Sequence, residues 1–93
     1  MTIFVKDPMA VIDFAIDWSA NGPAERTVVE SDWQVTPGGG GAVTVAAAVR
    51  EPQRSVASLA GGVQGQLYHV VNRVTFSDGR SDERTLVVRV EDQ

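Results

Sequence analysis

Apolar and polar positions alternate along most of this chain. Between residues 11 and 18, large apolar side chains occupy every second position: Ile12, Phe14, Ile16 and Trp18. Asp13 and Asp17 lie at intervening positions. A period of two is that of a half-buried β-strand. The two aspartates would also share one stripe of a short amphipathic helix, but the β-branched and aromatic content favours the strand.

The same alternation returns in four later segments, which we also expect to be strands. The apolar positions expected to face the core are Val29, Trp33 and Val35 in residues 27–36; Val43, Val45, Ala47 and Val49 in residues 42–49; Tyr68, Val70, Val74 and Phe76 after residue 66; and Leu86, Val88 and Val90 in residues 83–90. Val87 and Arg89 should face outward. The small inward side chains of residues 42–49 indicate either a closely approaching sheet or a short edge strand.

Residues 2–5 and 55–59 are weaker strand candidates, and they bring the expected number to about seven. Turn-forming residues separate the segments, at residues 19–23, 38–41 and 50–53. Asp78-Gly79, between the last two segments, predicts a hairpin with a type I′ turn. This pattern predicts an all-β, antiparallel sandwich of the immunoglobulin-like or fibronectin-III-like kind, formed by residues 1–93 as a single domain.

Tyr68 sharpens the prediction of a sandwich. It follows a glycine-rich stretch at residues 61–65 and begins the penultimate strand. This placement is typical of the tyrosine corner, in which a buried tyrosine hydroxyl bonds back to the backbone of the preceding corner. The alternative is an ordinary core aromatic residue with a solvated hydroxyl.

Composition excludes several classes of protein. The chain has 93 residues, 43% of them hydrophobic, a net charge of -4 and no cysteine. Disulfides and thiolate metal sites are therefore excluded. An acidic chain without a basic cluster is not expected to bind nucleic acid or an anionic membrane. The N-terminus does not resemble a signal peptide and no apolar run is long enough to span a bilayer, so we expect a soluble protein made in the cytosol.

Candidate catalytic groups are sparse. His69 shares its strand face with Val71 and Arg73, so we expect it to face solvent or an interface rather than bind a metal. The glycines at 38–41 lack the Lys-Ser/Thr of a phosphate-binding loop. Asp7, Asp13 and Asp17 do not have EF-hand spacing. We therefore expect neither an enzyme nor a cofactor or metal site.

A dense group of mixed charges surrounds the predicted Asp78-Gly79 hairpin. This group consists of Arg73, Asp78, Arg80, Asp82, Glu83 and Arg84. It is either a solvated turn or a polar contact surface, because guanidinium groups make bidentate bonds to carboxylates. The hairpin is the strongest candidate in the sequence for a protein-binding site.

Several short motifs resemble, in their order and spacing, those of phage fiber-tail adaptor proteins, also called phage tail accessory proteins. The motifs are Asp17-Trp18, Ser31-x-Trp33, Asn72-Arg73 and Asp82-Glu83-Arg84. They lie in the first and last thirds of the chain, while residues 36–60 depart from the pattern with their four-glycine loop. The resemblance implies a non-enzymatic virion component with an immunoglobulin-like sandwich. Such a protein would bridge tail, neck or fibre components, assemble in the host cytoplasm and form multimers in the virion.

A different class, a generic adhesion or carbohydrate-binding module, uses the same kind of scaffold. Such a module needs exposed aromatic side chains on which sugars stack. Alternation directs nearly all six aromatic residues of this chain inward, which favours the adaptor over the module. An enzyme or a nucleic-acid-binding protein has less support than either.

Overall fold

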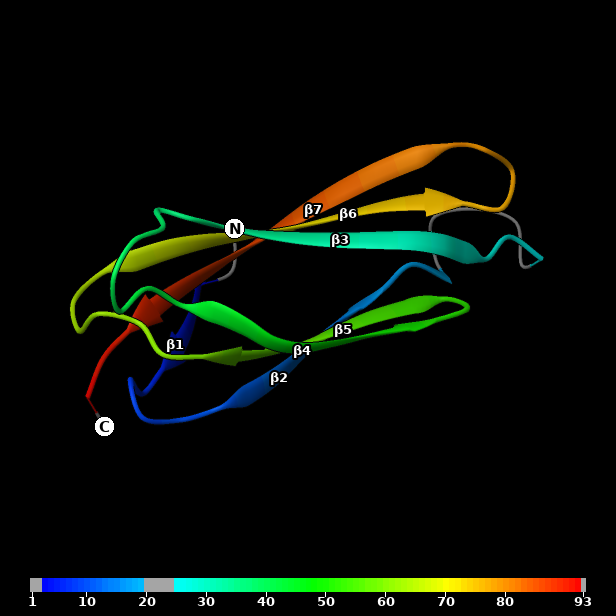
Figure 1. Ribbon diagram of the computed structural model, residues 1–93. Helices are drawn as coiled ribbons and strands as arrows, with labels where there is room; N and C mark the ends of the chain where they lie inside the picture. The colour runs from blue at the N-terminus through cyan, green and yellow to red at the C-terminus, as the bar shows by residue number, and fades with distance from the viewer. Residues whose placement is uncertain (1–2, 20–24, 93) are drawn as a thin grey trace.

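The computed structural model describes residues 3–19 and 25–92, which form seven strands arranged in two layers (Figure 1). The strands are β1 (Ile3–Lys6), β2 (Ile12–Asp17), β3 (Val28–Thr36), β4 (Thr44–Glu51), β5 (Arg54–Ala60), β6 (Leu67–Phe76) and β7 (Ser81–Val90). The all-β prediction is confirmed, and each expected strand is present within a few residues of its predicted bounds. Thr2 and residues 20–24, in the predicted first strand and first turn, lie outside the described residues.

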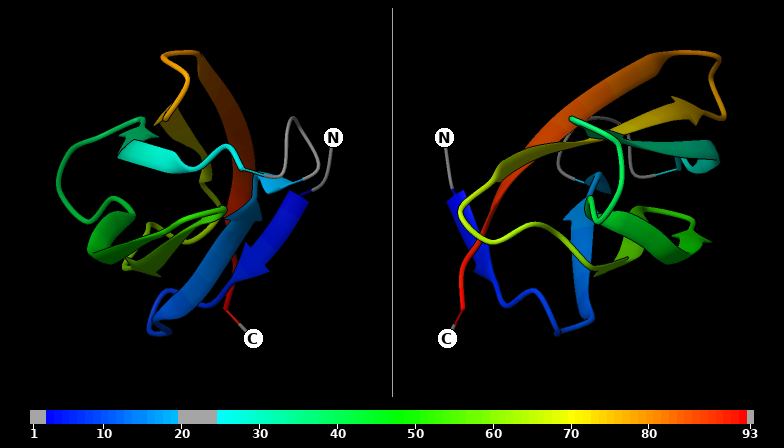
Figure 2. Two further views of the ribbon diagram at one scale, coloured as in Figure 1. Left: turned by 90° about the vertical axis from the view of Figure 1, so that its right-hand side faces the viewer. Right: turned by 60° about the vertical axis from the view of Figure 1, so that its left-hand side comes forward.

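The strands form a four-stranded sheet with the order β1-β7-β6-β3 and a three-stranded sheet with the order β2-β5-β4. All ladders are antiparallel except β1–β7, which is parallel, so the expectation of a purely antiparallel sandwich was wrong for β1. β1 runs beside the last residues of β7 and near β2, as Figure 2 shows. The rings of Phe4 and Phe14 meet edge to face at 5.2 Å, and this contact joins β1 to β2.

The core consists of two clusters of buried side chains between the sheets. The first contains Val43, Ala57, Leu59, Tyr68, Val70, Val88 and Val90. The second contains Ile16, Trp18, Val28, Val74 and Phe76. Trp33 and Leu86 are half-buried and pack against both clusters. The predicted inward rows of β2, β6 and β7 are therefore confirmed, because alternate side chains of a strand point to opposite faces of its sheet.

Two predicted rows were wrong in part, because a β-bulge reverses the alternation: Trp33, Val35, Val43 and Val45 face the core as predicted, whereas Val29, Ala47 and Val49 do not. In β3 the bulge between Val28 and Glu30 turns Val28 inward and leaves Val29 41% exposed. In β4 the bulge follows Val45, so that Ala47 lies exposed and Val49 is 56% exposed, instead of facing the core. A bulge adds one residue to one strand of a pair and shifts every later side chain to the other face.

Val87 faces outward as predicted, but it is only 3% exposed. Its neighbours across the sheet are Ile3 of β1 and His69 of β6. The sequence did not reveal that β1 would lie against this part of β7, and the flanking strand covers Val87. β4 lies at an edge of its sheet, which confirms one of the two interpretations of its small side chains.

The tyrosine corner is present. The backbone N–H of Val63 donates a hydrogen bond of 3.0 Å to the hydroxyl of Tyr68, which is 2% exposed. Gly62 takes a φ of 111°, and a Cβ there would lie 2.5 Å from a methyl group of Val90. Only glycine allows the corner to pack this closely against β7.

Candidate interaction surface

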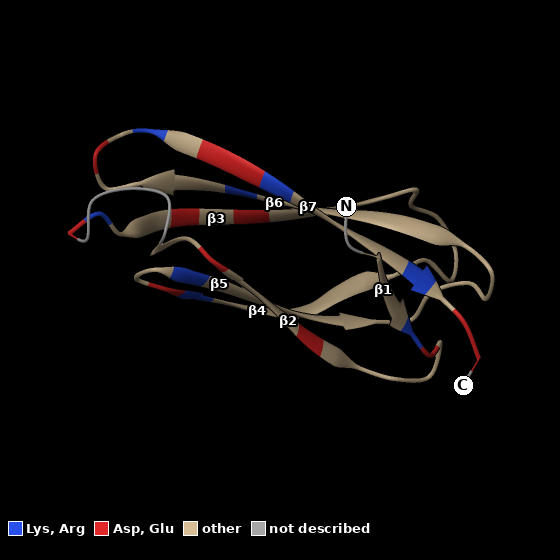
Figure 3. Ribbon diagram, turned by 180° about the vertical axis from the view of Figure 1, so that it is seen from behind, with Lys and Arg blue, Asp and Glu red and all other residues tan. Residues whose placement is uncertain are grey.

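The β6–β7 hairpin carries all six residues of the predicted binding site. Its charged positions, with those of β3, gather at the end of the four-stranded sheet beside the β6–β7 turn (Figure 3). The register places Arg73 between Asp32 of β3 and Glu83 of β7, on the face of the sheet that points away from the core. The structure thus adds Asp32 to the group. Sequence alternation put Asp32 on a polar face but could not show that β3 pairs with β6.

The turn itself differs from the predicted type I′. The N–H of Gly79 bonds to the Phe76 carbonyl at 2.9 Å, and the N–H of Phe76 bonds to the Arg80 carbonyl at 2.7 Å. Gly79 has a φ of 88°, whereas no non-glycine residue of the described chain has a positive φ. A type I′ turn needs positive φ at both central residues; this is the pattern of a type I turn followed by a glycine bulge.

Asp78 is occupied by intramolecular contacts. Its carboxylate accepts a hydrogen bond of 3.0 Å from the backbone N–H of Arg80 and forms an ion pair of 3.7 Å with Arg26. The Arg26 guanidinium lies over the ring of Phe76, 3.8 Å from its centroid. Asp78 and Arg26 therefore hold the turn against the end of the core.

Arg84 lies on the other face of β7, because its partner in the ladder is the buried Asn72. Its guanidinium lies 4.8 Å from the centroid of the Trp18 ring. One of its nitrogens, Nη1, donates to the backbone carbonyl of Asp17 at 3.4 Å. Arg84 thus closes the space between the edge of β2 and the edge of β7. All six predicted residues, Asp78 and Arg84 included, are exposed.

A buried polar network lies beneath this surface. Asn72 is 0% exposed; its Oδ1 accepts a hydrogen bond of 3.3 Å from Trp18 Nε1. Its Nδ2 donates to Ser31 Oγ at 2.9 Å and to the Asp32 carbonyl at 3.0 Å. Ser31 Oγ donates to Ser55 Oγ at 3.3 Å, so the network reaches from one sheet to the other. Trp18, Ser31 and Asn72 all belong to the motifs that carried the family resemblance.

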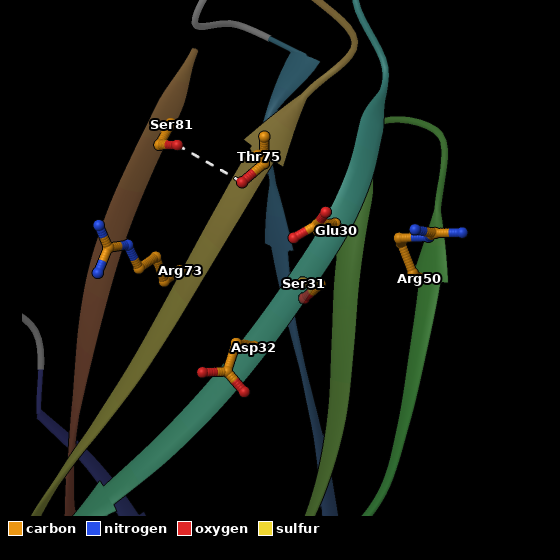
Figure 4. A pocket seen from close by; sticks show the side chains of 7 residues that line it. All are labelled: Glu30, Ser31, Asp32, Arg50, Arg73, Thr75 and Ser81. Atoms are coloured by element: carbon orange, nitrogen blue, oxygen red, sulfur yellow. Dashed lines mark hydrogen bonds between the residues drawn. The ribbon is translucent and has the colours of Figure 1, made fainter. Parts of the chain in front are cut away.

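Glu30, Ser31, Asp32, Arg50, Arg73, Thr75 and Ser81 line a shallow, open depression on this side of the molecule (Figure 4). Its rim carries two acidic and two basic side chains. Among the described residues, none of these four side chains forms an ion pair with another. The charges are therefore available to groups from outside the chain, and the depression is suited to polar contacts rather than to enclosing a small molecule.

The other candidate chemical groups lie apart from this surface. His69 is exposed on the outer face, opposite Thr36 of β3. Asp13 and Asp17 are exposed on β2, where Ser19 donates to Asp17 from its hydroxyl and its N–H and so lowers the pKa of that carboxyl. Residues 3–19 and 25–92 contain no group of three or more side chains arranged to hold a metal ion. In the same residues, no helix is long and apolar enough to span a membrane.

Lys6 is a buried charge that sequence reasoning missed. It is 0% exposed, and its Nζ donates to the carbonyls of Gly61 at 2.7 Å and Asp7 at 2.9 Å. Burial lowers the pKa of Lys6, although the nearby Asp7 carboxylate opposes this effect. Lys6 thus links the end of β1 to Gly61, in the glycine-rich stretch that precedes β6. In the sequence, only its position beside Asp7-Pro8 distinguished it from other lysines or arginines.

The structure shows a two-sheet sandwich that exposes charges at one end of its four-stranded sheet. A family model described as podophage GP4 fiber-tail adaptor protein gp77 matches residues 6–89. The chain belongs to this family. No curated protein matches the chain. The family membership confirms the resemblance seen in the motifs, and the protein is a bacteriophage structural protein of the fiber-tail adaptor kind.

Proposed function

We propose that this protein is a non-enzymatic connector that bridges the tail or neck of a phage particle to its fibres or other connector proteins. It would be made in the host cytoplasm, assemble there with these structural proteins, and remain in the virion in several copies. Membership of the adaptor family is the observation that carries the proposal. The exposed mixed charges at one end of the four-stranded sheet support it.

We place the contact surface at Arg73, Arg80, Asp82 and Glu83, with Asp32 beside them. All five are exposed. Asp78 and Arg84 belong to the same hairpin but act by holding it in shape, through Arg26 and Trp18 respectively. Charges on a rigid hairpin set the register of a partner and discourage wrong partners. Repeated copies around a symmetric tail allow individually weak contacts to act together.

Charge also supports the choice of partners. The net charge of -4 opposes binding to nucleic acid or to an anionic membrane, so other virion proteins are the expected partners. The alternative, a carbohydrate-binding module, requires an exposed aromatic platform. None of the six aromatic residues, all of which the structure describes, is exposed. The adaptor is therefore the function that we propose.

For the scaffold we propose the immunoglobulin-like arrangement. In that fold, the second, fifth and fourth strands share one sheet, and the third, sixth and seventh share the other. The strand orders β2-β5-β4 and β7-β6-β3 have this distribution. β1 departs from the seven-stranded constant-type pattern because it pairs with β7 rather than with β2.

Reversing exposed charges on the hairpin tests the contact surface. A phage that lacks this gene would be supplied with the wild-type protein, with Arg73→Glu/Arg80→Glu, or with Arg54→Glu, a control on the opposite sheet. We expect the double variant to fold with a slightly lowered melting transition, because reversal at Arg73 puts like charges opposite Asp32 and Glu83. Its amount in purified particles should fall about tenfold, because like charges would then also face the partner. The control should be incorporated normally, because its ion pair with Glu51 is exposed and contributes little.

Two results would contradict these proposals separately. Normal incorporation of the double variant would move the contact surface away from the hairpin. Absence of the wild-type protein from purified particles would reject the connector function itself.

A further inference from the structure

The outer face of the four-stranded sheet is charged at one end and largely apolar at the other. Beside the β6–β7 turn, the register sets Asp32, Arg73 and Glu83 in one row across β3, β6 and β7 (Figure 3). We call these three residues the charged row. Farther from the turn, most outward positions of β1, β6 and β7 are apolar. They hold Ile3, Val5, Leu67, Val71 and Val87, which we call the apolar patch.

The ladders make the apolar patch continuous, because directly paired residues share one face of a sheet. Ile3 is paired with Val87. Val5 and Leu67 lie on either side of Arg89. Ile3 is 50% exposed, Leu67 41% and Val5 37%. The water-facing side of an antiparallel sheet is normally polar, so this cluster of exposed large apolar side chains indicates a docking surface.

We propose that the apolar patch and the charged row form one continuous interface, and that its occupant is a different virion protein rather than a second copy of this chain. The inference rests on the proposed connector function, and it adds the apolar patch to the contact surface of the hairpin. Gln34, Val71 and Thr85 form the row between the two regions. In the part of the chain that the structure describes, no strand lies over this face. Protein interfaces commonly combine an apolar centre with a polar rim.

The charged row defines which groups the partner must present. Its signs alternate, from Asp32 through Arg73 to Glu83. A partner with an acidic group between two basic groups would pair with all three, and complementary charges of this kind set the register of an interface. Leu67 lies six residues before Arg73 on β6, which is about 20 Å at about 3.4 Å per residue. The partner must therefore carry apolar side chains at distances of up to about 20 Å from its charges.

A second copy of the chain does not match this face. A two-fold axis parallel to the strands would lay patch on patch, but it would also set Arg73 against Arg73 and Asp32 against Glu83. Like charges so placed oppose association. An axis across the strands would lay each charged row on the other copy's patch, unless the two patches alone overlap. The strand spacing and the rise per residue make the patch about 200 Å² in plan, whereas a stable interface buries about 800 Å² on each partner.

Neutral substitutions test the patch apart from the charges. In the complementation assay of the charge variants, Val5→Thr/Leu67→Thr should lower the amount of protein in purified particles about tenfold, because the interface loses apolar contacts while the net charge stays the same. Val11→Thr/Val49→Thr is the matched control, since these side chains are 63% and 56% exposed and lie outside the apolar patch. The control should be incorporated normally, and both variants should melt close to the wild type.

Single cysteines test whether the face is covered in the particle, because the natural chain contains none. Thr85→Cys lies in the row between the charged row and the apolar patch, and Ala15→Cys is the control on the other sheet. Both positions are exposed, so both cysteines should react with a maleimide in the free protein. In purified particles, we expect Thr85→Cys to react at least about tenfold more slowly than Ala15→Cys.

Three results would contradict the proposal. Normal incorporation of Val5→Thr/Leu67→Thr, with loss of Arg73→Glu/Arg80→Glu, would keep the connector function and remove the patch from the interface. Equal reaction rates of the two cysteines in particles would show that docking does not select this face. A wild-type protein that sediments as a dimer, with Thr85→Cys already protected in solution, would assign the face to a second copy. Absence of the wild-type protein from particles would instead reject the connector function, and this inference with it.

Discussion

At the scale of single residues, polar groups inside the core determine how the two sheets fit together. Asn72 bonds to Trp18, Ser31 and the backbone of Asp32, and thereby joins β2, β3 and β6. A buried polar group is stabilising only when its hydrogen bonds are made, so each partner of Asn72 depends on it. Three of the motif residues, Trp18, Ser31 and Asn72, are in this respect structural residues that support the charged surface from beneath.

Asn72→Ala should therefore lower the free energy of unfolding by about 2–4 kcal/mol. The substitution leaves Trp18 Nε1 without its acceptor, removes the donor to Ser31 Oγ and to the Asp32 carbonyl, and opens a small cavity. Urea denaturation measures the change. Arg73→Ala, the next residue and on the opposite, exposed face, is the control, and it should change stability by less than about 0.5 kcal/mol. Equal effects of the two substitutions would mean that the network does not stabilise the fold.

At the scale of strands and turns, the conformation of individual glycines decides how the hairpins close. Gly79 has a φ of 88° and has no atom within 4 Å of where a Cβ would lie. Gly40 is equally open, but its φ is outside the positive range. Because neither position is crowded, a difference in stability between alanine variants at Gly79 and Gly40 reports the cost of the backbone conformation alone.

Gly79→Ala should destabilise the protein by about 1 kcal/mol, because an L-residue is strained at positive φ. Gly40→Ala should be neutral or stabilise by up to about 1 kcal/mol, because it restricts the unfolded chain without strain in the folded one. Thermal unfolding of the two variants beside the wild type provides the comparison. A loss of stability in Gly40→Ala as large as that in Gly79→Ala would show that the glycine loop is constrained.

At the scale of the whole molecule, the two core clusters are joined by shared side chains, so we expect them to unfold together. Trp33 and Leu86 contact both clusters, and Trp33 projects from the centre of β3. A chain of 93 residues has a modest core, and small domains are stable by only about 5–15 kcal/mol. The indole of Trp33 therefore contributes a large share of the cooperativity of the fold.

Trp33→Ala should lower the free energy of unfolding by about 3–5 kcal/mol, which is comparable with the whole stability of a marginal domain. We expect a folded fraction that melts well below the wild type, or a chain that does not fold at 37 °C. Circular dichroism and fluorescence of the remaining Trp18 follow the transition. An unchanged melting temperature would mean that Trp33 packs against a partner rather than the core.

The sequence by itself determined the number of strands, the inward rows of β2 and β6, the tyrosine corner and the charged hairpin. These features follow from local chemistry: alternation with a period of two, glycine at positive φ, and charges next to a turn. The family motifs were likewise readable without a structure. Arg73, Arg80, Asp82 and Glu83 were predicted to form a contact surface and are exposed, because hairpin pairing is local in the sequence. Their role in binding stays a prediction.

Only the tertiary structure decided the features that depend on distant segments. The bulges in β3 and β4 reversed Val29, Ala47 and Val49, since nothing in the local pattern shows where a strand gains a residue. The burial of Lys6 and Val87 required β1 to lie along β7. The contact of Arg84 with Trp18 and the exposed edge of β4 also depend on which strands become neighbours. Strand order is set by the packing of two complete sheets, and alternation within a single strand carries no information about it.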